Sequence, residues 1–166
     1  MSWLQTTEGP LVVGLGNPLM GDDGIGVTVA RDLRFRRSIG APVIEAGTPG
    51  FGLLELLMDE RPVVFIDAVD AGRTPGSVFW VDPDKVAGEA LPYSLHQVTL
   101  ADVIELLEAT GTRADIRIIG IQPEKIGVGF DLSDVLEDRL SEIIATTETM
   151  LRDSLRIESR PDDDHG

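Results

Sequence analysis

The chain has 166 residues, with 14 Lys and Arg against 29 Asp and Glu, and a formal net charge of −15 at pH 7. Such an acidic chain repels phosphate backbones, so we expect no nucleic-acid partner. It has no cysteine, which excludes disulfides, thiolate metal sites and cysteine nucleophiles. No apolar run approaches the roughly 18 residues of a membrane span, and the first residues do not resemble a signal peptide. These features favour a cytoplasmic protein without a membrane partner.

Short apolar runs rich in valine and isoleucine alternate with amphipathic segments along the chain. Strands are predicted at residues 11–15, 41–46, 62–66, 77–82 and 115–121, and helices at residues 22–37, 53–58, 99–109 and from Ser133 onward. This alternation is typical of an α/β three-layer sandwich, a twisted and mostly parallel sheet with helices on both faces, as in phosphorylase- and hydrolase-like folds. We expect one domain over residues 1–157 and a disordered acidic tail over residues 158–166.

The loop after the first strand contains a G-x-G pair but does not favour a dinucleotide site. Ligands of such sheets bind beyond the carboxyl ends of the strands, so this loop is a place to search. The third glycine of a dinucleotide loop is replaced by Leu19, and Asp22 and Asp23 would repel a pyrophosphate at the start of the following helix. The two acids have a simpler alternative role as helix caps.

Two further residues with useful chemistry follow predicted strands or precede predicted helices. Asp67 ends a buried strand, and His96 precedes the helix predicted from Thr99. Each has a structural alternative, namely a side chain that is hydrogen-bonded to nearby backbone. If Asp23, Asp67 and His96 meet at one sheet edge, two carboxylates and an imidazole form an open site for a divalent ion such as nickel or zinc.

Five short blocks of sequence occur in an order that is familiar from one enzyme family. The chain resembles the [NiFe] hydrogenase maturation endopeptidases over roughly residues 10–150. The blocks are GLGNPLMGDDGIG at residues 14–26, EAGTPG at 45–50, DAVD at 67–70, HQ at 96–97 and GIQPE at 120–124.

The resemblance implies an endopeptidase that removes the C-terminal extension from the nickel-loaded precursor of the [NiFe] hydrogenase large subunit. The positions that contact metal and carry catalysis in the family match Asp23, Asp67 and His96, and we expect Glu45 and Asn17 to support them. Nickel is expected to arrive with the substrate rather than to stay bound. Whether the metal or a carboxylate activates the attacking water is left open. We expect a monomer that binds the precursor transiently.

Two alternatives come from other functional classes. A non-catalytic scaffold that recognises the nickel-loaded precursor would use the same residues. The opening LVVGLGNP also looks like that of peptidyl-tRNA hydrolases, but their following tyrosine and His-Asn pair are absent here, and so is the basic charge expected of a tRNA-binding protein.

Overall fold

A central five-stranded sheet organises the chain. The computed structural model describes residues 10–58, 61–82, 100–112 and 114–158. The strand order is β2-β1-β3-β5-β4, with every neighbouring pair parallel except β4, which runs antiparallel to β5 at one edge. The strands are β1 (Leu11–Leu15), β2 (Val43–Gly47), β3 (Val63–Ala68), β4 (Val78–Val81) and β5 (Ile116–Ile121).

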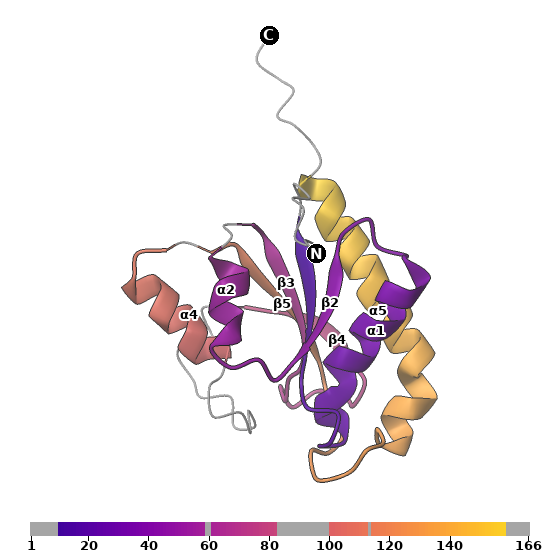
Figure 1. Ribbon diagram of the computed structural model, residues 1–166. Coiled ribbons are helices and arrows are strands. Elements are labelled where there is room, and N and C mark those ends of the chain that lie inside the picture. Colours follow the sequence, from indigo (N-terminus) through magenta and orange to yellow (C-terminus); the bar gives the residue numbers. More distant parts are fainter. Residues whose placement is uncertain (1–9, 59–60, 83–99, 113, 159–166) are drawn as a thin grey trace.

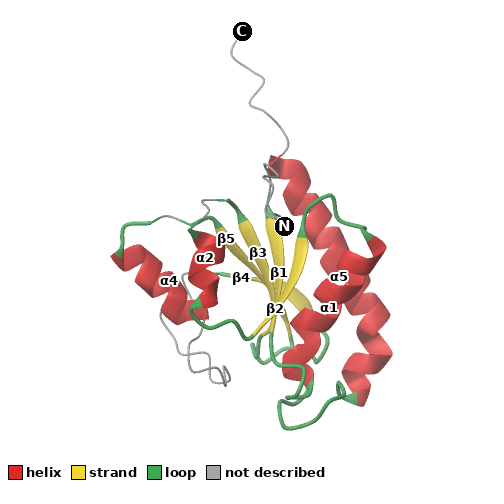
Figure 2. Cartoon of the chain, in the orientation of Figure 1, coloured by secondary structure: helices red, strands yellow, loops and turns green. Residues whose placement is uncertain are grey.

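Helices cover both faces of this sheet (Figures 1 and 2). Helices α1 (Ile25–Arg36) and α5 (Asp134–Glu158) lie on one face, and α2 (Gly52–Leu57) and α4 (Leu100–Ala109) lie on the other. Strand side chains alternate between two apolar cores because successive residues of a strand point to opposite faces. The predicted α/β three-layer sandwich is therefore confirmed. Within the described ranges, no helix combines the length and apolar character that crossing a membrane requires.

The predicted elements agree with the structure to within a few residues. Ser133 precedes α5 as predicted, and its Oγ accepts a 3.4 Å hydrogen bond from the Leu136 backbone N–H. The predicted helix over residues 22–37 is divided, because a short 3₁₀ turn, η1 (Asp22–Gly24), comes before α1. Thr99 and residues 159–166 of the predicted tail lie outside the described residues.

Glycines bring the start of α1 unusually close to the carboxyl ends of β1 and β3. A Cβ atom on Gly26 would lie 2.2 Å from the Ile66 carbonyl oxygen and 2.4 Å from the Leu15 carbonyl oxygen. Gly16 has a φ of 121°, and a Cβ there would lie 1.8 Å from the Asp23 carbonyl oxygen. Only glycine allows this approach, which sets η1 directly against β3.

Gly26→Ala is expected to destabilise the protein by about 3 kcal/mol, because the new methyl group forces α1 away from the sheet. This loss has to exceed the gain of up to about 1 kcal/mol that alanine brings to a helix. Gly40→Ala is the matched control, since a Cβ on the exposed Gly40 meets nothing within 4 Å. Urea unfolding measures both variants, and equal stability of the two would contradict the close approach.

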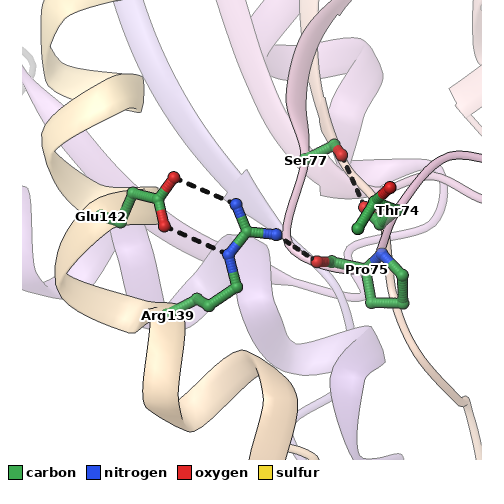
Figure 3. A network of polar contacts seen from close by, with 5 residues as sticks. All are labelled: Thr74, Pro75, Ser77, Arg139 and Glu142. Atoms are coloured by element: carbon green, nitrogen blue, oxygen red, sulfur yellow. Dashed lines mark hydrogen bonds and ion pairs between the residues drawn. The ribbon is translucent and has the colours of Figure 1, made fainter.

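The loop between β3 and β4 is fastened to α5 (Figure 3). Arg139 of α5 donates a hydrogen bond from Nη1 to the Pro75 carbonyl and pairs through its other nitrogens with Glu142 at 3.0 and 3.1 Å. The same loop is closed by the Ser77 hydroxyl, which donates to the Thr74 carbonyl at 2.6 Å. Hydrogen bonding from the guanidinium lowers the pKa of the Glu142 carboxyl. The chain that leaves β3 is thus held on the α5 side of the sheet.

Candidate active site

Asp23 and Asp67 are brought together where η1 lies against β3. Asp67 belongs to β3 itself, one residue after Ile66, whose carbonyl faces Gly26 at the start of α1. Asp23 lies in η1, three residues before Gly26, and is only 3% exposed. The predicted convergence of these two carboxylates at one edge of the sheet is therefore what the structure shows.

The proximity of the two acids changes the ionisation of Asp67. Its pKa is raised from 3.8 to about 7, first by burial and then by the negative charge of Asp23. A hydrogen bond of 2.8 Å from the Ala68 backbone N–H to Oδ1 opposes the rise in part. A carboxyl group with a pKa near neutrality can both accept and donate a proton at physiological pH.

Asn17 orders the loop that carries Asp23. Its backbone N–H donates to Asp23 Oδ2 at 2.8 Å, and its side-chain Oδ1 accepts from the Leu19 backbone N–H at 2.9 Å. The first bond orients the Asp23 carboxylate, and the second closes a tight turn in the loop. Asn17 therefore contacts one of the two site acids directly.

Asp22 has a role that the sequence did not indicate. Its carboxylate is fully buried and accepts four hydrogen bonds of 2.7–3.1 Å, from the backbone N–H groups of Glu124, Lys125 and Ser133 and from the Ser133 hydroxyl. The capping alternative for Asp22 and Asp23 is wrong, because the N-cap residues of η1 and α1 are glycines that make no side-chain cap. Asp22 instead ties the β1–η1 loop to the loop before α5.

Gln122 is a second buried polar residue without a role assigned from the sequence. Its Oε1 accepts hydrogen bonds from the Ala71 and Arg73 backbone N–H groups at 2.8 and 3.0 Å. Its Nε2 donates to Asp70 Oδ1 at 2.9 Å and to the Pro123 carbonyl at 3.1 Å. A glutamine directly after an apolar strand was the available signal. The contacts show that it shapes the loop following Asp67.

The structure does not place the other two predicted site residues, Glu45 and His96, beside the acid pair. Glu45 of β2 has its carboxylate against α1, where it forms ion pairs with Arg31 at 2.8 Å and Arg34 at 3.1 Å. His96 lies outside the described residues. The described residues thus bring Asp23 and Asp67 together, with Asn17 beside Asp23 and Glu45 turned toward the helix.

The pair of acids is suited to a cation. Two neighbouring carboxylates repel each other when both are ionised, and a divalent ion between them removes that repulsion. Among the residues that the structure describes, no group of three or more histidine, aspartate or glutamate side chains is placed to hold a metal ion. The described part of the site therefore offers two of the three predicted metal-contacting groups.

Comparisons with known proteins agree on one family. A family model described as hydrogenase maturation protease matches residues 27–150. The chain belongs to this family. A putative hydrogenase maturation protease of Methanocaldococcus jannaschii is 32% identical over 139 residues, which cover 81% of this chain and 86% of that protein. The hydrogenase expression/formation protein HoxM of Azotobacter vinelandii is 33% identical over 126 residues, which cover 73% of this chain.

Solved structures of the family share the fold. The hydrogenase maturating endopeptidase HybD of Escherichia coli superposes with a TM-score of 0.72 at 26% identity, covering 88% of this chain and 93% of that one. A [NiFe] hydrogenase maturation protease of Thermococcus kodakarensis gives a TM-score of 0.66 at 31% identity, covering 86% and 99%. The chain spans only about three fifths of the length of several curated relatives, including 61% of HoxM.

Proposed function

We propose that this protein is an endopeptidase that removes the C-terminal extension from the nickel-loaded precursor of a [NiFe] hydrogenase large subunit. The observation that carries the proposal is the coupled pair Asp23 and Asp67, which lies at the carboxyl ends of parallel strands in a member of the maturation protease family. We further propose that the protein acts as a monomer in the cytoplasm, where a chain without cysteine has no disulfide to lose.

In this proposal Asp67 and Asp23 have different chemical roles. Asp67 accepts a proton from the attacking water and returns it to the leaving amine. Asp23, fixed by the Asn17 backbone N–H, keeps its carboxylate aimed at the site and contributes negative charge there. His96 is the third group that we assign, on the resemblance of its sequence block.

Nickel belongs to the substrate in this proposal. Asp23, Asp67 and His96 recognise the ion that is already seated in the precursor, so that cleavage depends on metal insertion. Nickel bound there supplies positive charge that polarises a nearby carbonyl or water. The described carboxylates favour such a cation, because its charge offsets both the burial of the Asp67 carboxylate and the repulsion by Asp23, which together raise the pKa of Asp67.

The proposal is tested with purified precursor prepared with and without nickel. The protein is expected to release one C-terminal peptide from the nickel-loaded form and none from the nickel-free form. Mass spectrometry of the two reaction mixtures measures this release. Asp23→Asn and His96→Ala are expected to abolish the release while leaving the unfolding midpoint within a few degrees of wild type.

An intact nickel-loaded precursor in a stable complex with wild-type protein would instead assign the chain as a non-catalytic scaffold. Cleavage that proceeds equally without nickel would overturn the role given to the substrate metal. The peptidyl-tRNA hydrolase hypothesis is not retained, because the family model that matches this chain is that of the hydrogenase maturation proteases.

A further inference from the structure

Three exposed apolar side chains gather on the two loops beside Asp23. Leu19 follows β1, and Val128 and Phe130 lie between β5 and α5. The exposed fractions are 55% for Leu19, 93% for Val128 and 83% for Phe130. Isolated exposed apolar residues are ordinary, but a group at the rim of a site is a feature of interaction surfaces. These three residues are called the loop surface below.

Backbone hydrogen bonds join the two loops that carry these side chains into a short ribbon. The Gly21 N–H donates to the Gly129 carbonyl at 2.9 Å, and the Gly129 N–H donates to the Leu19 carbonyl at 3.0 Å. Met20 and Gly129 are paired in parallel. Leu19, Val128 and Phe130 each lie directly next to one of these paired residues in the chain.

The ribbon is anchored from below by Asp22. The buried carboxylate binds the backbone at Glu124 and Lys125 before the exposed residues and at Ser133 after them. In Figure 1, the loop that leads into α5, drawn in orange, runs beneath the start of α1. A loop fixed at both ends keeps its apolar side chains in place, which reduces the entropy lost when a partner binds.

The loop surface is linked to the candidate active site through Asn17. Leu19 donates its backbone N–H to Asn17 Oδ1, and the Asn17 backbone N–H in turn binds Asp23 Oδ2. One turn of chain thus joins an exposed apolar side chain to a site carboxylate. The net charge of −15 opposes association with a second copy of this acidic chain and favours a different partner.

We propose that the loop surface docks an apolar segment of the substrate polypeptide next to the bond that is cut. This inference rests on the proposed function, since it assumes that a polypeptide is the substrate of the site. Apolar docking beside the acids binds the substrate chain before the chemical step and selects chains with apolar residues at that point.

The test compares Val128→Ser/Phe130→Ser with Phe35→Ser on the nickel-loaded precursor. Phe35 is 88% exposed but lies at the other end of α1, about 15 Å along the helix from the site. The double variant is expected to raise KM at least about tenfold with kcat nearly unchanged, because docking precedes the chemical step. Phe35→Ser and Phe130→Leu are expected to keep KM within about twofold of wild type. All variants should unfold at the wild-type temperature, since the changed side chains are exposed.

Binding of the precursor to each variant is measured in parallel. This measurement distinguishes a failure of the proposed endopeptidase function from a failure of the proposed docking surface. If wild type binds the precursor without cutting it, the proposed function fails, and the loss of binding in the double variant still decides the docking surface. A double variant that binds and cuts like wild type overturns the inference alone. The docking inference is also overturned if sedimentation shows that wild type is a dimer and the double variant a monomer, with no change in KM.

Discussion

Asp67→Asn is expected to lower processing of the nickel-loaded precursor at least about a thousandfold while making the metal-free protein more stable above pH 7. The amide removes the proton acceptor and the negative charge from the site. It keeps the shape of the side chain, and its oxygen still accepts the hydrogen bond from the Ala68 N–H that Asp67 Oδ1 receives at 2.8 Å. Activity and stability should therefore change in opposite directions.

The sign of the stability change follows from the pKa of Asp67. This pKa is about 7 in the folded protein against 3.8 as its ordinary value. Between these values the folded state binds more protons than the unfolded state, so wild-type stability falls as the pH rises from about 4 to 7. The pKa shift limits this loss of wild-type stability to about 4 kcal/mol in total. We expect a total loss of about 2 kcal/mol, because Asp67 retains some solvent exposure. Asparagine has no such pH dependence.

Urea unfolding of both proteins at pH 5 and pH 8, with a chelator present, measures this effect. Asp67→Asn should gain about 1 kcal/mol relative to wild type between the two pH values, because part of the effect has already occurred below pH 5. Asp70→Asn is the control, because the hydrogen bond from Gln122 lowers the pKa of the exposed Asp70, so its linkage lies below about pH 4 and the variant should not change relative to wild type between pH 5 and pH 8. A wild-type stability that is flat between pH 5 and pH 8 would contradict the raised pKa of Asp67.

Asp22→Ala is expected to cost about 3–5 kcal/mol of folding free energy. The substitution leaves the donors of four hydrogen bonds without their acceptor, and the Ser133 backbone and hydroxyl are buried. Domains of this kind have only about 5–15 kcal/mol in total, so the loss is severe. Urea unfolding measures it, and faster hydrogen exchange at the Ser133 amide should accompany it.

Asp131→Ala is the matched control for Asp22→Ala. Asp131 is an exposed acid of the same loop, so its removal makes the same change in net charge. We expect its stability to stay within about 0.5 kcal/mol of wild type. If the two variants lose equal stability, the effect arises from charge rather than from the buried hydrogen bonds.

The order and type of the described elements could be predicted because the sequence patterns are local. Apolar runs such as Leu11–Leu15 mark strands buried on both faces, and their alternation with helices predicts a parallel sheet. The meeting of Asp23 and Asp67 followed from the same rule, since parallel strands end at one edge. The bounds shifted where tertiary contacts decide them, as at Asp67, which the ladder with β5 includes in β3.

The roles of Asp22 and Gln122 could not be predicted from local patterns. Asp22 stands next to a helix start, where an aspartate ordinarily caps, but its partners lie 102 to 111 residues away. Gln122 binds backbone about 50 residues earlier in the chain. Such partners depend on how loops come together after the sheet forms. Glu45 likewise looked like a site acid from its place after a strand, whereas two arginines of α1 take up its charge.

The bond between Asp22 and Ser133 has a consequence for the order of events during biosynthesis. It joins positions separated by 111 residues, and contacts of such long sequence separation form late because a large loop must first be closed. A growing polypeptide on the ribosome therefore cannot fix the loop beside Asp23 until the residues that begin α5 have emerged.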